Sequence, residues 1–441
     1  MRGAWIPPTV LLVTLVAQAL APRMRLLLVL SGAGLCALGC SLTGLATTGQ
    51  LLADVPWGVL VILVGLGLLA ELLAEAQALS VLAVWTARLS RGAPGRMRLA
   101  FACGMFVVSG LVNNLTALVL VLPVLLALLR ASDPTARSVR WTLGTLLVAC
   151  NLGGAATPIG DFPAILLLSR GSMRFGDYLV RALPATLVGF GLLLGVVTFV
   201  VAPERDLPVD PLGRRLALRL TEALHRNTRL RMGAFVPAAL SLGAMLAVWS
   251  LAPAAWGLDP ALVCWIGVCA ALLARGLRGE RIARTRVDIE AALFLLGLFV
   301  MVAAARRAGV FEALGQWVLG LPLGPRGRLV VFLLGAGLVT GVFSAGPGMA
   351  SLLDVAATLA QTLPPAAVYV GLALSVCAGS SLFLTAATAG PLAQGLVERA
   401  DLRDRHDRPL GFAFRDFLPV GLVAFVLIES VALGYALLAA R

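Results

Sequence analysis

Polar residues that could bind an ion or a small anion interrupt two neighbouring apolar stretches. The stretches are GLVNNLTALVLVLP at 110–123 and NLGGAATPIGDFPAIL at 151–166. Asn and Thr side chains donate and accept hydrogen bonds without charge. The free N–H groups and carbonyls of an interrupted helix suit anions and cations, respectively. The candidate binding residues of this first set are Asn113, Asn114, Thr116, Asn151, Gly153, Gly154, Thr157 and Asp161.

Asp161 is the acidic residue of the first set. A carboxylate inside a membrane segment is costly unless it is paired, protonated or bound to a cation. Asp161 can therefore carry a proton, or hold Na⁺ together with Asn114. An N-cap for the following FPAILLLS segment is an equally good interpretation. Asn151 likewise has two interpretations, as a binding residue or as a residue that caps the break or joins two helices.

A second set of candidates lies in FSAGPGMAS at 343–351 and CAGSSLFLTAATAGP at 377–391. These stretches contain no amide or acidic side chain, so backbone groups and hydroxyls would have to bind the ligand. The candidates are Ser344, Gly346, Gly379, Ser380, Ser381 and Thr385. Asp354 either faces the same cavity or pairs with a loop arginine.

Composition places these stretches in a membrane. The 441 residues are 60% hydrophobic and 13% charged, whereas soluble domains have about 25% charged residues. Apolar runs of about 20 residues, the length that crosses a bilayer, recur throughout the chain. Lipid cannot satisfy an interrupted backbone, so the interruptions must be buried in protein or line a polar cavity. The sequence therefore predicts an all-α polytopic membrane protein.

The positive charge of the chain comes from 35 arginines and no lysine. The arginines lie in short loops, where they orient helices and meet anionic headgroups, so nucleic-acid binding is not expected. A chain without lysine cannot form the P-loop of an ATPase. Both histidines lie in charged loops, and the seven cysteines show no CxxC spacing. We expect a protein that is not an enzyme, has no cofactor, and uses H⁺ or Na⁺ as its coupling ion.

The apolar runs predict two similar halves. The expected crossing helices lie at about 8–21, 24–46, 57–76, 139–168, 178–202, 232–252, 259–276, 288–305, 367–397 and 412–439. Two of these, 139–168 and 367–397, are expected to break, the first of them at its glycine-rich centre. Hairpins that enter and leave on one side are expected at 98–130 and 326–363, and amphipathic segments at 77–92 and 309–320.

Residues 1–202 and 232–441 then form two repeats, each of about five transmembrane helices with one re-entrant hairpin and one broken helix. An odd number of crossings gives the halves opposite orientations. If the basic linker 203–231 is cytoplasmic, 26 of the 35 arginines lie on the cytoplasmic side and 9 on the other. This asymmetry follows the positive-inside rule. We expect an inverted repeat in a bacterial plasma membrane, with both termini outside.

The motifs GLVNNLTA, NLGGAATPIGDFPA and the early LADVPW resemble the ion transporter superfamily. It groups arsenite efflux permeases, sodium–proton antiporters and divalent-anion symporters, and includes citrate-transporter-like proteins. The resemblance implies a homodimer in which a transport domain carrying both hairpins moves like an elevator against a scaffold domain. It also implies a first site from Asn113, Asn114, Thr116, Gly153, Gly154 and Asp161, and a second from Ser344, Gly379, Ser381 and Thr385.

These observations lead to one main hypothesis and two alternatives. We expect a secondary active transporter for a small anion or metalloid oxyacid, of the arsenite or organic-anion type, coupled to protons or to the membrane potential. A sodium–proton antiporter using Asp161 is the first alternative. A sodium-coupled dicarboxylate symporter is a weaker one, because neither hairpin carries a Ser-Asn-Thr signature. A passive channel and an intramembrane enzyme fit the two hairpins and the scarcity of buried acids less well.

Overall fold

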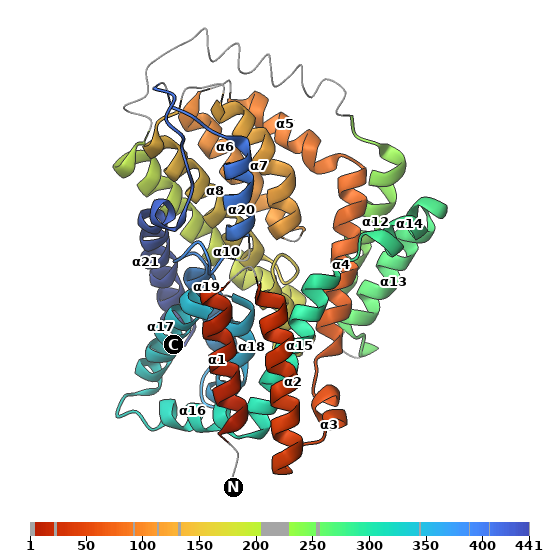
Figure 1. Ribbon diagram of the computed structural model, residues 1–441, viewed down its shortest axis with the longest axis vertical. Helices are drawn as coiled ribbons and strands as arrows, with labels where there is room; N and C mark the ends of the chain where they lie inside the picture. Colours follow the sequence, from red (N-terminus) through yellow and green to blue (C-terminus); the bar gives the residue numbers. More distant parts are fainter. Residues whose placement is uncertain are drawn as a thin grey trace.

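The computed structural model describes residues 5–21, 24–90, 93–112, 114–130, 134–203, 229–252, 256–343, 345–387, 389–404 and 406–440. These residues form helices, with one isolated β-bridge between Arg403 and Pro409 (Figure 1). Seven of the helices are long and apolar enough to cross a membrane, by length and composition. The predicted all-α membrane architecture is therefore confirmed.

One group of helices, which we call the support helices, packs mainly on itself. Helix α15 lies against α2, α2 against α1, and α4 against α12 and α13. The support helices are α1 (Ile6–Leu20), α2 (Arg25–Thr43), α4 (Trp57–Glu75), α12 (Met232–Leu251), α13 (Pro260–Leu273) and α15 (Ile289–Arg307). Leu27, Leu38 and Leu42 on α2 are exposed, as lipid-facing side chains are.

The second group, which we call the hairpin group, contains two helical hairpins and two interrupted helices. The hairpins are α6 (Pro94–Ser109) with α7 (Asn114–Arg130), and α17 (Pro325–Phe343) with α18 (Ala345–Leu359). The interrupted helices are α8 (Ala136–Ala156) with α9 (Phe162–Ser169), and α19 (Pro365–Ser380) with α20 (Gly390–Ala400). Helices α10 (Phe175–Gly195), continued by the π-helical Val196–Val201, and α21 (Phe414–Ala439) complete the group.

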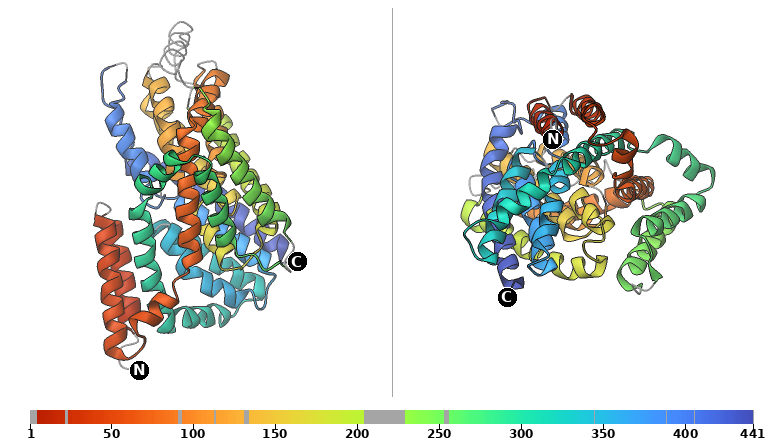
Figure 2. Two further views of the ribbon diagram at one scale, coloured as in Figure 1. Left: turned by 90° about the vertical axis from the view of Figure 1, so that its right-hand side faces the viewer. Right: turned by 90° about the horizontal axis from the view of Figure 1, so that it is seen from below.

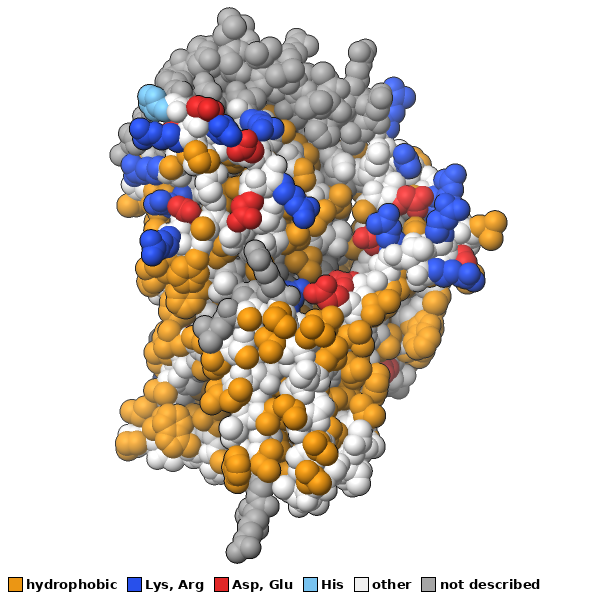
Figure 3. Space-filling view, in the orientation of Figure 1, with side chains coloured by type: hydrophobic (Ala, Val, Ile, Leu, Met, Phe, Trp, Pro, Cys, Tyr) orange, Lys and Arg blue, Asp and Glu red, His pale blue; other side chains and the backbone are white. Residues whose placement is uncertain are grey.

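The two hairpins lie toward opposite ends of the molecule. Figures 1 and 2 place α6 and α7 near the upper end and α17 and α18 in the lower part. Shorter helices connect or cover these elements: α3 (Thr48–Ala53), α5 (Ala78–Ser90), α14 (Leu277–Thr285) and α16 (Val310–Leu319). Helix α5 packs on α6 and α7, and α16 packs on α18. Figure 3 shows charged side chains gathered over the upper part of one face and an apolar surface below them.

Several predictions about organisation stay predictions. Most of the linker 203–231 lies outside the described residues, and the division into 1–202 and 232–441 is not tested by the helices alone. The order of hairpin followed by interrupted helix does occur twice along the chain. That order, with hairpins at opposite ends, is what an inverted repeat requires.

Two glycines allow the interrupted helices to touch the hairpins backbone to backbone. A Cβ atom on Gly153 of α8 would lie 2.2 Å from the carbonyl oxygen of Phe106 on α6. A Cβ atom on Gly379 of α19 would lie 2.1 Å from the carbonyl oxygen of Gly337 on α17. No other residue type fits such an approach. The same packing device thus joins hairpin and interrupted helix in both places.

The expected position of the first helix break was wrong. Gly153 and Gly154 lie inside α8, and the chain leaves the helix after Ala156. Gly379 similarly occupies the last turn of α19, before the second break. These glycines remain helical. Their lack of a side chain allows two helices to pack closely and does not unwind the helix that contains them. The first break comprises Thr157 to Asp161, and the second break begins after Ser380.

The glycine contact predicts that Gly153→Ala destabilises the protein. The added methyl group would force α6 away from α8, and such overpacking typically costs about 1–3 kcal/mol. Gly191→Ala on α10 is the matched control, because a Cβ there meets nothing within 4 Å. Alanine also favours helix by up to about 1 kcal/mol relative to glycine. Thermal unfolding in detergent should show a lower midpoint for Gly153→Ala and no decrease for Gly191→Ala; equal midpoints would contradict the contact.

Candidate functional site

A cavity of about 160 Å³ lies where the support helices meet both hairpins and both breaks. The first hairpin contributes Leu115, the second contributes Gly346, and the breaks contribute Asp161 and Thr385. The support helices contribute Gln18, Arg25, Leu63, Leu66, Ala291, Phe294 and Leu295. The cavity is therefore mostly apolar with a few polar groups, the usual composition of a small-ligand site.

Two opposite charges line this cavity, Arg25 and Asp161. Arg25 at the start of α2 forms an ion pair with Glu290 at 3.2 Å, and its guanidinium lies 5.8 Å from the centre of the Phe294 ring. Both charged side chains of the pair are exposed, 44% for Arg25 and 59% for Glu290. An ion pair this open to solvent adds little stability. Arg25 can therefore turn to an anion in the cavity at small cost.

Asp161 sits at the first residue before α9. Its carboxylate accepts a hydrogen bond from the backbone N–H of Phe162 at 2.8 Å, so it is the N-cap of that helix. It also lines the cavity. The two interpretations of Asp161 made from the sequence are thus compatible. One carboxylate oxygen can cap the helix while the group faces the cavity.

Asn114, the first residue of α7, lies beside Asp161. A Cβ atom on Gly154 would come within 2.7 Å of Asn114 Oδ1 and 2.9 Å of Asp161 Cβ, so all three residues share one small space. Asn114 is buried and its Oδ1 is in hydrogen-bonding contact with Ser109 Oγ. Its Nδ2 is buried with no hydrogen-bond partner among the described residues. Ser109 Oγ also donates to the carbonyl oxygen of Cys150 at 2.6 Å.

Asn151 joins the two interrupted helices to each other. From α8 its Nδ2 donates to the carbonyl oxygen of Ser380 at 3.2 Å and to Ser381 Oγ at 3.1 Å on α19. Asn151 is 2% exposed. Of the two interpretations made from the sequence, this contact fits the residue that joins two helices. A small cavity of about 10 Å³, lined by Asn151, Asp161, Tyr178 and Ser380 among others, adjoins the crossing and is about large enough for one water molecule.

The structure separates the predicted site residues into three sets. Asp161, Gly346 and Thr385 line the central cavity. Asn114, Asn151, Gly153, Gly154, Thr157, Gly379, Ser380 and Ser381 lie behind it, where they hold the hairpins and interrupted helices together. Thr157 does so by donating to the carbonyl oxygen of Gly110 at 2.6 Å. Thr116 lines a different cavity. Asn113 and Ser344 lie outside the described residues.

Arg25 was missed as a site residue. The structure places it at the start of α2, where it lines the cavity. Gln18 on α1 was also missed. A signal existed, because the first turns of helices 25–43 and 289–307 carry residues of opposite charge, Arg25 and Glu290. Nothing in the sequence shows that these two helices pack side by side.

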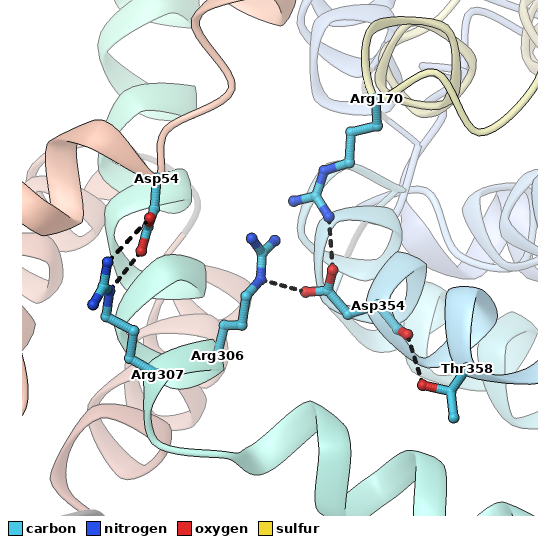
Figure 4. A network of polar contacts seen from close by, with 6 residues as sticks. All are labelled: Asp54, Arg170, Arg306, Arg307, Asp354 and Thr358. Atoms are coloured by element: carbon cyan, nitrogen blue, oxygen red, sulfur yellow. Dashed lines mark hydrogen bonds and ion pairs between the residues drawn. The ribbon is translucent and has the colours of Figure 1, made fainter.

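A network of ion pairs connects the support helices to the hairpin group (Figure 4). Asp354 of α18 binds Arg170, at the end of α9, and Arg306, on α15, each at 2.8 Å. The sequence left open whether Asp354 faces the cavity or pairs with an arginine, and it pairs. Arg307 separately binds Asp54 at 2.6 Å. Arg306 thus links α15 to the second hairpin.

A chain of apolar helices, with interrupted helices and two hairpins converging on a cavity, is a membrane transporter. The citrate transporter family matches this chain over residues 10–258 and 244–441. The protein belongs to that family. The match also confirms the resemblance to the ion transporter superfamily seen in the motifs.

Two relatives and one solved structure are similar to this chain over most of its length. The chain is 30% identical to the magnetosome protein MamN of Magnetospirillum gryphiswaldense over 90% of both chains. It is 28% identical to an uncharacterized transporter of Mycobacterium tuberculosis, over 79% of this chain and 80% of the relative. Its fold is similar to the YdaH transporter of Alcanivorax borkumensis, with a TM-score of 0.50, 18% identity, and coverage of 88% and 86%.

A more distant relative has a more specific name. The chain is 23% identical to sodium/proton antiporter 1 of Arabidopsis thaliana, over 74% of this chain and 54% of the relative.

The crossing of α8 and α19 predicts that Asn151→Ala is destabilising. Removing the side chain leaves the buried Ser380 carbonyl and Ser381 hydroxyl without this donor, which typically costs about 1–3 kcal/mol. Ser380→Ala is the control, because Asn151 binds the backbone oxygen of Ser380 and not its side chain. Thermal unfolding should separate the two variants, with Asn151→Ala clearly lower. A larger loss for Ser380→Ala would contradict the assigned contact.

Proposed function

We propose that the protein is a secondary active transporter of a small anion, with Arg25 as the anion-binding residue and Asp161 as the carrier of the coupling ion. The observation that supports this proposal is the central cavity, where Arg25 and Asp161 meet both hairpins and both interrupted helices. Its size of about 160 Å³ suits a small organic anion or a metalloid oxyacid. The guanidinium group matches the geometry of a carboxylate or oxyanion.

The contacts of Asn114 support a coupling ion at Asp161. A hydroxyl group has one proton, and the carbonyl oxygen of Cys150 can only accept it. The Ser109 hydroxyl can donate to the Asn114 side-chain oxygen or to the Cys150 carbonyl oxygen. The Asn114 Nδ2 has no hydrogen-bond partner among the described residues, and it shares the space around Gly154 with Asp161. We propose that this amide orients the Asp161 carboxylate for a proton or a cation such as Na⁺.

The arrangement of the two helix groups supports an elevator-type movement. The hairpin group packs mostly on itself, and so do the support helices. The central cavity lies between the groups, so sliding one group along the other would carry the cavity across the membrane. We propose that the hairpin group is the moving transport domain, that the support helices form the scaffold of a homodimer, and that the protein resides in the plasma membrane with linker 203–231 in the cytoplasm.

A sodium–proton antiporter is the second candidate. The observation that favours it is the crowding of Asn114, Gly154 and Asp161, which brings one amide and one carboxylate group together. The plant relative named sodium/proton antiporter 1 agrees with this candidate. In it, Na⁺ and H⁺ would compete for Asp161, and Arg25 would have no part in binding.

Two variants in proteoliposomes distinguish these functions. With imposed proton or sodium gradients and a panel of anions including citrate and arsenite, Asp161→Asn should abolish gradient-driven transport in either case, because amide groups carry no exchangeable ion. Arg25→Gln should raise the KM for the anion about tenfold or more, since losing a charged hydrogen bond costs about 1.5–3 kcal/mol. Sodium-dependent proton flux that survives Arg25→Gln unchanged, without anion uptake, would replace the anion transporter by the antiporter.

The elevator proposal predicts which cross-links stop transport. In a cysteine-free background, Arg306→Cys with Asp354→Cys joins α15 to the second hairpin, and a bismaleimide should block transport. Arg170→Cys with Asp354→Cys joins two elements of the hairpin group and should leave transport intact after the same treatment. Uptake is measured before and after cross-linking, with the extent checked by mass spectrometry. Equal inhibition of both pairs would exclude this division into moving and fixed parts.

A further inference from the structure

A second and larger cavity, of about 820 Å³, lies between the end of α4, the first half of α7 and α14. We call it the basic vestibule. Its lining residues are Glu71, Ala74, Glu75, Leu115, Thr116, Val119, Leu120, Arg231, Arg278, Arg281, Ile282, Thr285 and Arg286. Leu115 lines both this vestibule and the central cavity, so the first turn of α7 separates the two.

The vestibule has an excess of uncompensated positive charge. Arg231, Arg278, Arg281 and Arg286 form no ion pair among the described residues. Of the two lining acids, Glu75 is already paired at 3.3 Å with Arg275, which is not part of the lining. Among the described residues, Glu71 is then the lining acid without an ion pair, and the lining contains four arginines without one. Figure 3 shows basic side chains gathered over α14, above the apolar part of this face.

Two glycines determine how α14 lies against α13. Gly276 turns the chain with a positive φ of 54°, and a Cβ atom on Gly279 would lie 2.0 Å from the carbonyl oxygen of Leu272 on α13. This close contact holds α14 against α13. Residues 278, 281, 282 and 285 then form one stripe of the helix, and all four line the vestibule. Arg284, elsewhere on α14, pairs with Glu280 at 2.7 Å and is not part of the lining.

We propose that the basic vestibule binds an oxyanion with more than one negative charge, of the phosphate or polycarboxylate class. Several guanidinium groups around one space favour such ligands, because each offers paired N–H donors and their summed field concentrates anions. For a solute, this inference deepens the proposed function, since the solute would reach the central cavity past Leu115. The same chemistry is offered by a free solute and by the phosphomonoester headgroup of phosphatidic acid.

Thiol modification measures the field in the vestibule without any transport. Thr285→Cys supplies a thiol in the lining, in a background where Cys103 and Cys269 are replaced by alanine. The rates for negatively and positively charged methanethiosulfonate reagents are each divided by the rate with a free thiol in solution. We expect a ratio of at least about tenfold in favour of the negative reagent, and we expect Arg278→Gln with Arg281→Gln to reduce it several-fold. Arg284→Gln, the matched control on the same helix, should leave it unchanged.

Added anions then identify the source of the ligand. Inorganic phosphate or citrate that slows modification in phosphatidylcholine vesicles supports a solute site. Slower modification in vesicles containing phosphatidic acid, with no effect of either solute, supports a headgroup site. Absence of any preference for the negative reagent, or a preference that survives the double variant, overturns the proposal. These rates do not depend on uptake. A failure of this proposal is therefore distinguishable from a failure of the proposed anion transport, which the uptake assays with Arg25→Gln measure.

Discussion

The crossing of two interrupted helices, joined by one buried amide, is the contact on which the rest of the structure depends. Backbone that leaves a helix inside a membrane has no water to satisfy it. Asn151 supplies the donor at the point where α19 ends, from the last two turns of a helix more than two hundred residues earlier in the chain. Gly153 and Gly379 then bring a hairpin against each interrupted helix at backbone distance. Without these contacts the ends of the helices would face lipid or empty space.

Both charges in the central cavity already have partners, which a ligand could replace. Asp161 is held by the N-terminus of α9, and Arg25 by an exposed ion pair with Glu290. Each charge has a partner when the cavity is empty, and neither partner is so strong that it excludes a ligand. The apolar side chains around them exclude other ions. A ligand at such a site would replace the present partners of Arg25 and Asp161. The free-energy difference between the empty and the occupied cavity would then be small.

Sequence reasoning located the elements and the interruptions, because the hydropathy of the chain and the residues Asn, Gly, Thr and Asp in apolar stretches follow from the physics of the bilayer. It placed most helix ends within a few residues, but it placed the first break a few residues too early. Gly153 and Gly154 suggest unwinding in sequence, yet they serve packing, since a glycine does either depending on what lies opposite. It also left Asp354 unresolved and missed Arg25, because both roles depend on which distant helices become neighbours.

The lack of an amide or acid in the second set of candidates has a consequence for stoichiometry. Among the described residues, Asp161 is the acid that lines the central cavity, and Gly346 and Thr385 face it without charge. In the proposed cycle, this site would move one coupling ion for each cargo molecule. If the cycle moves no net charge, a single exchanged proton sustains about a tenfold difference in cargo concentration for each pH unit across the membrane. On this proposal the carrier would concentrate its cargo modestly rather than build steep gradients.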